Sequence, residues 1–279
     1  MNREDTPLLA VIQMQSGESW PDNREQAGRR IAEAAQAGAR LVVLPENFGF
    51  MGACEAKRLA LAETPGAGPM QAFLAESAAR HGLWLVGGTL GLREPGQRRV
   101  RAATLVYDDS GHLRARYDKM HLFDVDLPQG GERYRESDSF APGMAPVGVD
   151  TPFGRLGLAI CYDLRFPELF RYYAQDGVEL IVLPAAFTET TGRAHWEVLL
   201  RARAIENQCL VVAANQCGSH PGDRRTWGHS LIVNAWGEVM ADAGRREGMA
   251  LARFDRPAQR ELRTRFPVLT HRRERLTSR

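Results

Sequence analysis

Short apolar runs alternate along the chain with longer stretches in which apolar positions recur every three or four residues. The runs predict buried strands, and the periodic stretches predict helices. In the first half we expect strands at 8–14, 41–44 and 83–87, and helices at 22–37 and 69–81. Asp22 is the expected N-cap of the first helix. Gly38 and Gly82 follow the two helices, at the place where glycine commonly ends a helix.

The second half repeats this alternation. Strands are expected at 156–160, 180–183 and 210–214, and helices at 167–175 and near 195–206. The segments Leu41-Val-Val-Leu-Pro45 and Leu180-Ile-Val-Leu-Pro184 carry the same apolar run followed by proline. Two related half-domains are one interpretation of this match, and an accidental likeness between short buried strands is the other.

The continuous apolar strands, separated by helices, predict an α/β fold whose sheets are covered by helices. No linker or low-complexity segment divides the chain, so we expect residues 1–279 to form a single domain. Arginine dominates residues 263–279. We interpret this segment as a basic C-terminal tail, solvated or in contact with another subunit, rather than as a nucleic-acid-binding arm.

The composition argues against several classes of protein. A net charge of +2 is far less basic than that of a general nucleic-acid binder. The polar N-terminus is unlike a signal peptide, and no apolar stretch reaches the roughly 20 residues of a membrane span. The four cysteines form no CxxC pair, which favours a reducing, cytoplasmic location. Cys217, His220 and His229 match no standard zinc spacing, so we expect no metal site.

Lysine is rare in this arginine-rich chain. Of the 36 basic residues other than histidine, two are lysines, Lys57 and Lys119. Codon bias explains such a skew as readily as chemistry does. A lysine that persists where ordinary surface positions carry arginine nevertheless favours a role for a compact point charge, and Lys119 is the candidate.

Three positions carry the candidate chemistry. Cys161 ends an apolar strand just before a turn, where side chains of α/β folds face a ligand-binding crevice. It is either a nucleophile or a small buried core residue. Glu46 follows another buried strand, and burial there predicts a raised pKa suited to a general base. Lys119 follows a predicted hairpin over 102–117 and can stabilise an oxyanion or lower the pKa of a nearby thiol.

The segments around these residues resemble the motifs of the nitrilase superfamily of carbon–nitrogen hydrolases. The matching segments are Leu44-Pro-Glu46, Tyr117-Asp-Lys-Met-His121 and Ile160-Cys-Tyr-Asp-Leu-Arg165, in the order that this superfamily shows. The resemblance runs from residue 8 to about residue 255. It implies a four-layer α-β-β-α sandwich, a homodimer or higher homo-oligomer, and no cofactor.

The resemblance also implies a role for each matching residue. Cys161 is expected to attack an amide carbon after Glu46 takes its proton. Lys119 and the backbone N–H of Tyr162 are expected to bind the oxyanion. Glu136, in Tyr134-Arg-Glu-Ser-Asp138, matches the second glutamate of the superfamily and is expected to orient Lys119 or the substrate amide.

A narrower resemblance concerns the substrate. Residues 183–196, 200–207 and 227–230 are similar to the ω-amidase and deaminated-glutathione amidase branch, which hydrolyses amides of 2-oxo acids. Arg165 is a candidate for binding a substrate carboxylate, with an ion pair to Glu168 or Asp163 as the alternative. The candidates for lining the pocket are Phe187, Thr190 and Thr191. Arg225-Thr-Trp and Asn234-Ala-Trp depart from the residues common in relatives.

The sequence therefore predicts a thiol amidohydrolase that forms a Cys161 thioester, with deaminated glutathione or a related 2-oxo-acid amide as the leading substrate. An N-carbamoyl-amine hydrolase or an aliphatic amidase is the alternative within this class. A binding protein that keeps the fold without catalysis is the alternative from another class, and the presence of all four matching catalytic residues argues against it.

Overall fold

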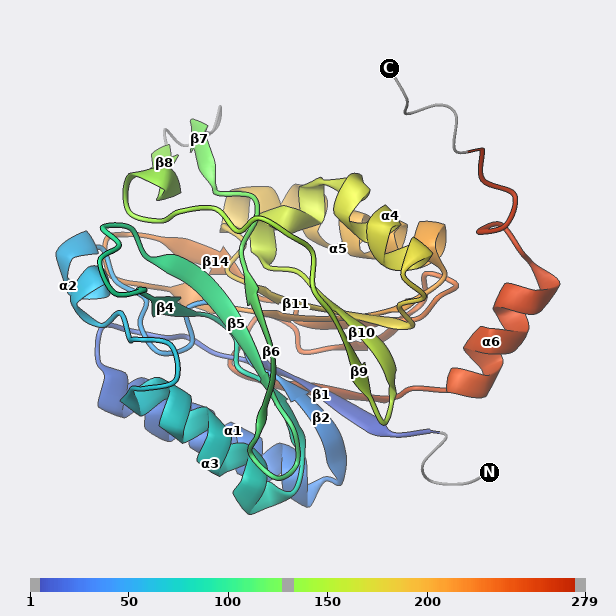
Figure 1. The fold of residues 1–279 in the computed structure, drawn as a ribbon, viewed down its shortest axis with the longest axis horizontal. Coiled ribbons are helices and arrows are strands. Elements are labelled where there is room, and N and C mark those ends of the chain that lie inside the picture. Colours follow the sequence, from blue (N-terminus) through green and yellow to red (C-terminus); the bar gives the residue numbers. More distant parts are fainter. Residues whose placement is uncertain (1–5, 127–132, 274–279) are drawn as a thin grey trace.

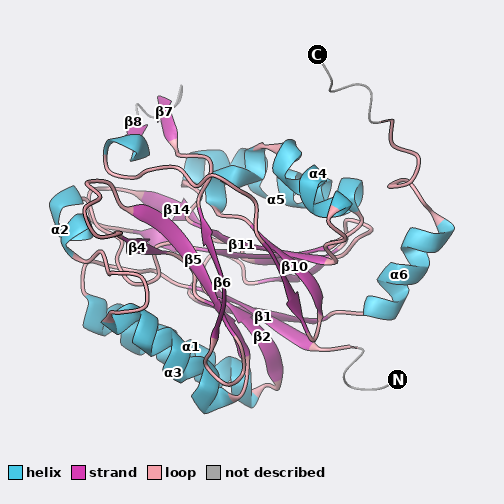
Figure 2. Ribbon diagram, viewed as in Figure 1, coloured by secondary structure: helices cyan, strands magenta, loops and turns pink. Residues whose placement is uncertain are grey.

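The structure, a computed structural model, describes residues 6–126 and 133–273. Two β-sheets pack face to face, and helices cover the outer face of each sheet (Figures 1 and 2). The helices α1 (Trp20–Gln36) and α3 (Pro69–His81) lie on one side, and α4 (Pro167–Gln175) and α5 (Glu189–Asn207) lie on the other. The predicted α-β-β-α sandwich is thereby confirmed.

The two sheets share one arrangement of parallel and antiparallel neighbours. The first sheet runs β17 (Gly248–Arg253), β1 (Leu8–Gln13), β2 (Ala39–Val43), β3 (Trp84–Val86), β5 (Arg101–Tyr107), β4 (Leu90–Leu92), and β6 (Leu113–Asp118) also pairs with β5. The second sheet runs β16 (Val239–Asp242), β15 (Leu231–Val233), β12 (Leu210–Asn215), β11 (Leu180–Ala185), β10 (Gly154–Leu158), β9 (Gly148–Thr151). In each sheet, three parallel neighbours are flanked on both sides by antiparallel strands. This shared arrangement supports the interpretation of two related halves.

The central strands of the first sheet bury side chains on both of their faces, since successive side chains point to opposite sides and both sides are covered. Leu9 and Val11 of β1 pack into the core between the sheets, whereas Ala10 and Ile12 pack under α1 and α3. The side chains of β2 also alternate between the core between the sheets and the layer under the helices. Burial on both faces explains why these strands read as unbroken apolar runs in the sequence.

Two helices begin earlier than predicted. The helix α1 begins at Trp20, two residues before the expected start, because Ser19 rather than Asp22 is the N-cap and Pro21 fits the first turn. The helix α5 begins at Glu189, where Thr188 caps it by accepting a hydrogen bond from the N–H of Thr191. The helix α3 has the predicted bounds and ends at Gly82, whose φ of 60° lies in the left-handed region.

The shorter elements lie outside the two large sheets and their covering helices. They are α2 (Glu55–Ala60), β7 (Asp124–Asp126), β8 (Arg133–Arg135), η1 (Glu136–Asp138), η2 (Cys161–Arg165), β13 (Cys217–Ser219) and β14 (Arg225–Trp227). The loops and turns that carry most of them follow the ends of the central strands, and they surround the candidate site described below.

The first residues of the predicted C-terminal tail belong to a helix. The helix α6 (Arg256–Arg265) lies at one side of the sandwich (Figure 1). Glu179 binds Arg256 and Arg260, and the half-buried Arg263 donates to the carbonyl oxygens of Gln208 and Val178. These contacts anchor the beginning of the basic segment, while residues 274–279 lie outside the described part of the chain.

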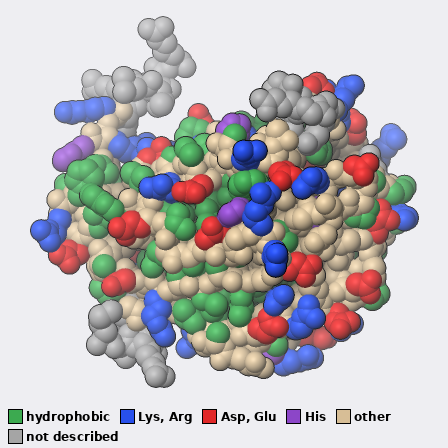
Figure 3. Space-filling model, turned by 180° about the vertical axis from the view of Figure 1, so that it is seen from behind, with side chains coloured by type: hydrophobic (Ala, Val, Ile, Leu, Met, Phe, Trp, Pro, Cys, Tyr) green, Lys and Arg blue, Asp and Glu red, His purple; other side chains and the backbone are tan. Residues whose placement is uncertain are grey.

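Charges of both signs interleave on the face that Figure 3 shows, with apolar side chains between them. Within residues 6–126 and 133–273, no helix is both long enough and apolar enough to cross a membrane.

Candidate active site

Cys161 is the first residue of η2, at the turn that follows β10. Its backbone φ is 44°, in the left-handed region that residues with a side chain rarely adopt. This sharp turn leaves the thiol at the end of the strand, where it lines a pocket of about 450 Å³. Such strained backbone geometry recurs at functional sites. The location therefore favours a reactive cysteine over a core residue.

Glu46 follows β2 and is 5% exposed. Its carboxylate is hydrogen-bonded to the thiol of Cys161. Its backbone is fixed from the opposite sheet, because Nε2 of the buried Gln216 donates to the carbonyl oxygen of Glu46 at 2.9 Å. The next residue, Asn47, donates its N–H to Thr89 Oγ1 at 2.8 Å. Both bonds restrict where the carboxylate can lie.

Lys119 follows β6 and is 2% exposed. Its Nζ donates to Glu46 Oε1 at 3.0 Å and to the two carboxylate oxygens of Glu136 at 3.0 and 2.8 Å. Glu136 is itself held by the N–H of Phe123, at 2.7 Å. The structure thus brings together the four residues Glu46, Lys119, Glu136 and Cys161, which lie far apart in the sequence. Lys57, in contrast, is an exposed partner of Glu18.

The pKa of Glu46 differs from the expectation. Burial acts to raise it, but the charge of Lys119, the hydrogen bonds from Cys161 and Lys119, and the charge of Arg224 together hold the pKa below its ordinary value. The prediction of a raised pKa, made from burial alone, was wrong because it left out these neighbouring cations.

The pKa values of the Cys161 thiol and of the Lys119 ammonium are both raised, so both groups keep their protons. Burial and the negative charge of Glu46 raise the pKa of Cys161 well above 9.0, and Lys119 and the backbone N–H of Ala186 only partly oppose them. Burial acts to lower the pKa of Lys119, but Glu136 and Glu46 outweigh it and raise that pKa. The resting site therefore holds a neutral thiol beside a carboxylate and an ammonium.

Asp163 connects the cysteine turn to the lysine segment. Its fully buried carboxylate accepts hydrogen bonds from Tyr117 Oη at 2.8 Å and from the N–H of Ile160 at 2.8 Å. It also accepts one from the N–H of His121 at 3.1 Å, and it lies 2.7 Å from His121 Nδ1. Tyr117 and His121 flank Lys119 in sequence, so one carboxylate sets the position of Lys119 relative to Cys161.

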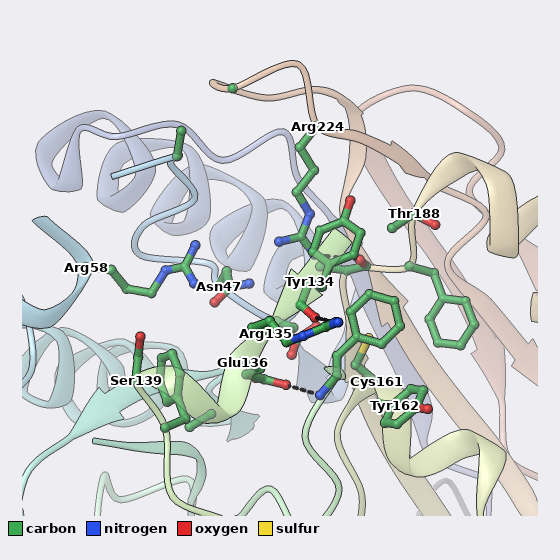
Figure 4. A pocket seen from close by; sticks show the side chains of 18 of the residues that line it. Asn47, Arg58, Tyr134, Arg135, Glu136, Ser139, Cys161, Tyr162, Thr188 and Arg224 are labelled. Atoms are coloured by element: carbon green, nitrogen blue, oxygen red, sulfur yellow. Dashed lines mark hydrogen bonds between the residues drawn. The ribbon is translucent and has the colours of Figure 1, made fainter. Parts of the chain in front are cut away.

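Aromatic and cationic side chains surround the catalytic candidates (Figure 4). Phe123 and Tyr134 come from the β7–β8 region, and their rings lie 4.9 Å apart. Phe187 and Thr191 line the pocket as predicted, whereas Thr190 is not among its lining residues. Tyr162 also lines the pocket, and it follows Cys161 at the start of η2, where backbone N–H groups lack intrahelical acceptors.

Arg165 lines the pocket without the ion pairs considered above. Among the described residues, neither Glu168 nor Asp163 forms an ion pair with it, and Asp163 is occupied by Tyr117, Ile160 and His121. The guanidinium lies over the rings of Tyr162 and Phe187, at 5.8 and 5.3 Å, and Nη1 is 3.2 Å from His195 Nδ1. Its charge therefore faces the pocket.

Sequence reasoning missed Arg224, which also lines the pocket. It comes from the turn between β13 and β14, and Figure 4 shows its side chain reaching toward the ring of Tyr134. In a chain with so many arginines, the residue type gave no signal. Asp163 lay within a quoted motif, but nothing in that motif indicated its role.

The residues considered for zinc have other partners. His220 is buried between the carbonyl oxygen of Ser16, at 2.8 Å, and Thr226 Oγ1, at 2.7 Å. His229 Nδ1 lies 2.9 Å from Asp242 Oδ2. Within the described ranges, no cluster of three potential ligands is found.

The model of the carbon-nitrogen hydrolase family matches residues 8–264, which is most of the chain. The chain belongs to the carbon-nitrogen hydrolase family. It is 42% identical over 266 residues to the deaminated glutathione amidase of Yersinia enterocolitica, covering 95% of this chain and 92% of that protein. It is also 42% identical to the human deaminated glutathione amidase over 275 residues, covering 96% and 83% of the two chains.

Solved structures of the nitrilase superfamily share the fold of this carbon-nitrogen hydrolase. The crystal structure of the Caenorhabditis elegans NitFhit protein superposes with a TM-score of 0.91 at 41% identity, covering 98% of this chain and 66% of that one. Saccharomyces cerevisiae Nit3, described as a member of branch 10 of the nitrilase superfamily, superposes with a TM-score of 0.85 at 28% identity, covering 97% of each chain.

Proposed function

We propose that this carbon-nitrogen hydrolase cleaves a linear amide through a thioester on Cys161. The observation that carries the proposal is the cluster in which Lys119 Nζ lies between Glu46 and Glu136 while Glu46 is hydrogen-bonded to the thiol. An ionised carboxylate beside a neutral thiol is the pair that a base-assisted attack needs.

In the first half of the reaction, the thiol proton passes to Glu46 as the Cys161 sulfur bonds to the amide carbon. The carbonyl oxygen becomes an oxyanion, which Lys119 and the N–H of Tyr162 stabilise. Because Glu136 holds the ammonium from the other side, Lys119 stays fixed when Glu46 loses its negative charge. The C–N bond then breaks, and Glu46 returns the proton to the leaving nitrogen.

In the second half, water replaces the amine. Glu46 takes a proton from this water while the water oxygen attacks the thioester carbon. The C–S bond breaks, the acid product leaves, and the proton from Glu46 returns to the sulfur. This chain's own residues perform each transfer, so the site returns to its starting state of a neutral thiol and a carboxylate.

The substrate that we propose is deaminated glutathione, the amide formed between a 2-oxo acid and cysteinylglycine. The names of the 42%-identical relatives support it, since both are deaminated glutathione amidases. The half-buried Arg165 supports it as well, because a cation that faces the pocket and has no ion pair among the described residues suits a substrate carboxylate. Phe187 and Thr191 would contact the remainder of the substrate.

The test measures amine release from deaminated glutathione, 2-oxoglutaramate, an N-carbamoyl amino acid and a simple aliphatic amide. We expect deaminated glutathione to have the highest kcat/KM, and rapid acid quenching followed by intact-mass analysis to detect an acyl adduct on Cys161. The Cys161→Ala variant should lose both the activity and the adduct, while Cys54→Ala, which changes an exposed thiol, should keep both. Full activity in Cys161→Ala would contradict the proposal.

We also propose that two copies associate through the α4–α5 layer. Its outer side exposes the apolar side chains of Tyr172, Val198 and Ile205, at 48%, 68% and 49%. A second copy packed on this layer would remove them from water.

A reducing, cytoplasmic location agrees with the four cysteines, which are all free thiols.

A further inference from the structure

One buried cation has no part in the proposed reaction. Arg203 of α5 is 5% exposed, and among the described residues it is the only arginine that is buried. It is not one of the residues that line the pocket. Taking a guanidinium out of water costs free energy unless well-placed partners compensate for the loss of hydration. The partners of Arg203 therefore indicate why this charge is buried.

The guanidinium of Arg203 donates hydrogen bonds from all three of its nitrogen atoms. Nε and Nη2 both donate to the carbonyl oxygen of Leu164, at 3.1 and 2.8 Å, and Nη1 donates to Glu206 Oε1 at 2.8 Å. Cζ lies 5.2 Å from the centre of the Phe170 ring. Because the guanidinium is a rigid plane, two donors directed at one oxygen restrict where that oxygen can lie. Arg203 thus ties the carbonyl group of Leu164 to α5.

Leu164 belongs to η2, the five-residue segment that begins with the proposed nucleophile. Three residues of η2 line the pocket, namely Cys161, Tyr162 and Arg165. The other two, Asp163 and Leu164, are fully buried. The carboxylate of Asp163 accepts a hydrogen bond from β6, and the carbonyl oxygen of Leu164 accepts two from α5. One side of η2 therefore serves the pocket, and the other side is anchored to two different parts of the fold.

The backbone of Cys161 depends on such anchors. Its φ of 44° lies in the left-handed region, which is unfavourable for a residue with a side chain. A conformation of this kind persists only where the surrounding structure fixes it. A 3₁₀ segment of five residues has few backbone hydrogen bonds, and their geometry is poorer than in an α-helix. The bonds from Arg203 to Leu164 supply part of what η2 lacks.

We infer that Arg203 is a positioning residue for the nucleophile, and that it keeps the turn at Cys161 in its strained conformation by holding the carbonyl oxygen of Leu164. The inference rests on the proposed thiol amidase function. In the observed conformation, the thiol is hydrogen-bonded to Glu46. Without Arg203, the end of η2 is free to move, the turn relaxes, and the sulfur moves away from the carboxylate that takes its proton.

The first test measures the reactivity of Cys161 without any substrate. Iodoacetamide alkylates Cys161 and the exposed Cys54, and peptide mass spectrometry gives both rates in the same sample. In Arg203→Met, we expect the rate at Cys161, divided by the rate at Cys54, to fall about tenfold or more, because the thiol has moved away from its base. The rate at Cys54 should stay at the wild-type value.

The second test measures the kinetics of the amide that the wild type hydrolyses best. We expect kcat/KM of Arg203→Met to fall about ten- to a hundredfold, since a small misplacement of a reacting group has an effect of this size. Arg203→Lys keeps the charge beside Glu206 but replaces the planar fork by one ammonium, so it should lie between the wild type and Arg203→Met in both tests. If Arg203→Met does not fold, Arg203→Lys carries both tests.

Arg263→Met is the matched control. The half-buried Arg263 of α6 also donates to two backbone carbonyl oxygens, those of Gln208 and Val178, at 2.8 and 2.7 Å. Both of these carbonyl groups lie outside η2. Arg263→Met should therefore lower the stability to urea, as Arg203→Met does, but it should keep the wild-type alkylation ratio and the wild-type kcat/KM.

The outcomes separate this inference from the proposed function. If the folded Arg203 variants keep the wild-type alkylation ratio, or if Arg263→Met lowers that ratio as much as they do, the role given to Arg203 is wrong while the amidase function stands. If the wild type hydrolyses no amide but Arg203→Met still slows the alkylation of Cys161, the proposed function is wrong and the positioning of Cys161 by Arg203 stands.

Discussion

Glu136 accepts hydrogen bonds from Lys119 Nζ at both of its carboxylate oxygens, at 3.0 and 2.8 Å. Because the same Nζ also donates to Glu46, all three of its protons are directed toward carboxylate oxygens in the resting site. A substrate oxyanion must therefore compete with one of these carboxylates. Protonation of Glu46 during the attack on the amide would free one donor at the moment when the oxyanion forms.

This geometry predicts that Lys119→Arg is not a conservative change. A planar guanidinium is too large for the space of a buried ammonium and cannot direct its donors toward Glu46 and Glu136 together. We expect kcat to fall about 10²–10³-fold, with a smaller change in KM. Lys57→Arg is the matched control, because Lys57 is exposed and pairs only with Glu18 among the described residues. Equal activities of the two variants would contradict the role given to Lys119.

The carboxylate of Asp163 predicts a separate effect on stability and on rate. In Asp163→Asn one oxygen becomes an NH₂ group, which would face the N–H or hydroxyl donors of Ile160, Tyr117 and His121. We expect a loss of about 2–3 kcal/mol of unfolding free energy, measured by urea denaturation, and a lower kcat at unchanged KM.

The control for Asp163 is Asp150→Asn. Asp150 is exposed and pairs with Arg155 at the surface, so its loss should change stability by less than about 0.5 kcal/mol. A drop in stability without any drop in kcat in Asp163→Asn would show that this carboxylate supports the fold but does not position Lys119.

The pKa shift of Glu46 predicts where activity is lost in acid. The proposed reaction needs an ionised Glu46, and Lys119 and Arg224 help to hold the pKa of Glu46 below the ordinary 4.5. We expect kcat/KM to stay level from about pH 8 downward and to fall only below pH 4.5. Arg224→Gln should move this fall to higher pH, because one of the cations that lower the pKa is removed.

The lowered pKa of Glu46 also makes the fold less stable in acid, in the same pH range in which activity is lost. A carboxylate with a lowered pKa in the folded state stabilises the fold above pH 4.5, and this contribution is lost as the pH falls through the folded-state pKa. The assay therefore includes a return to pH 7 after each acid incubation. A fall in kcat/KM near pH 6–7 that reverses fully would contradict the ionised resting state of Glu46.

The proposed dimer predicts that one exposed apolar residue of α5 controls association. Val198→Asp places a charge in the α4–α5 layer, and we expect it to yield monomers in size-exclusion chromatography with light scattering. Leu113→Asp is the control, since Leu113 of β6 is also exposed, at 49%, but lies on the other sheet. If both variants keep the mass of the wild type, the interface lies elsewhere.

Local signals fixed some elements better than others. The helix α3 was predicted with its observed bounds because Pro69 and Gly82 mark both of its ends. The start of α5 was missed by six residues, since Thr190, Thr191 and Gly192 have poor helix propensity and the cap at Thr188 is recognisable only with its partner. Helix periodicity alone locates the middle of an element rather than its ends.

The sequence likewise predicted some residues of the candidate site and missed others. Glu46, Lys119, Glu136 and Cys161 were found because each lies in a recognisable motif. Arg224 was not found, because its importance depends on which turn faces the pocket, and this follows from packing between distant segments. The direction of the Glu46 pKa shift was missed for the same reason: burial can be read from an apolar run, but the charge of a neighbour 73 residues away cannot.

The proposed catalytic groups follow strands of two different sheets. Glu46 and Lys119 follow strands of the first sheet, Cys161 follows a strand of the second, and Gln216 spans the gap with its bond to Glu46. The distance between Glu46 and Cys161 is therefore set by how the two sheets pack against each other. A mild denaturant that loosens the packing between the two sheets would inactivate the enzyme while each sheet still keeps its own hydrogen bonds. With increasing denaturant, activity should therefore be lost before the circular dichroism signal.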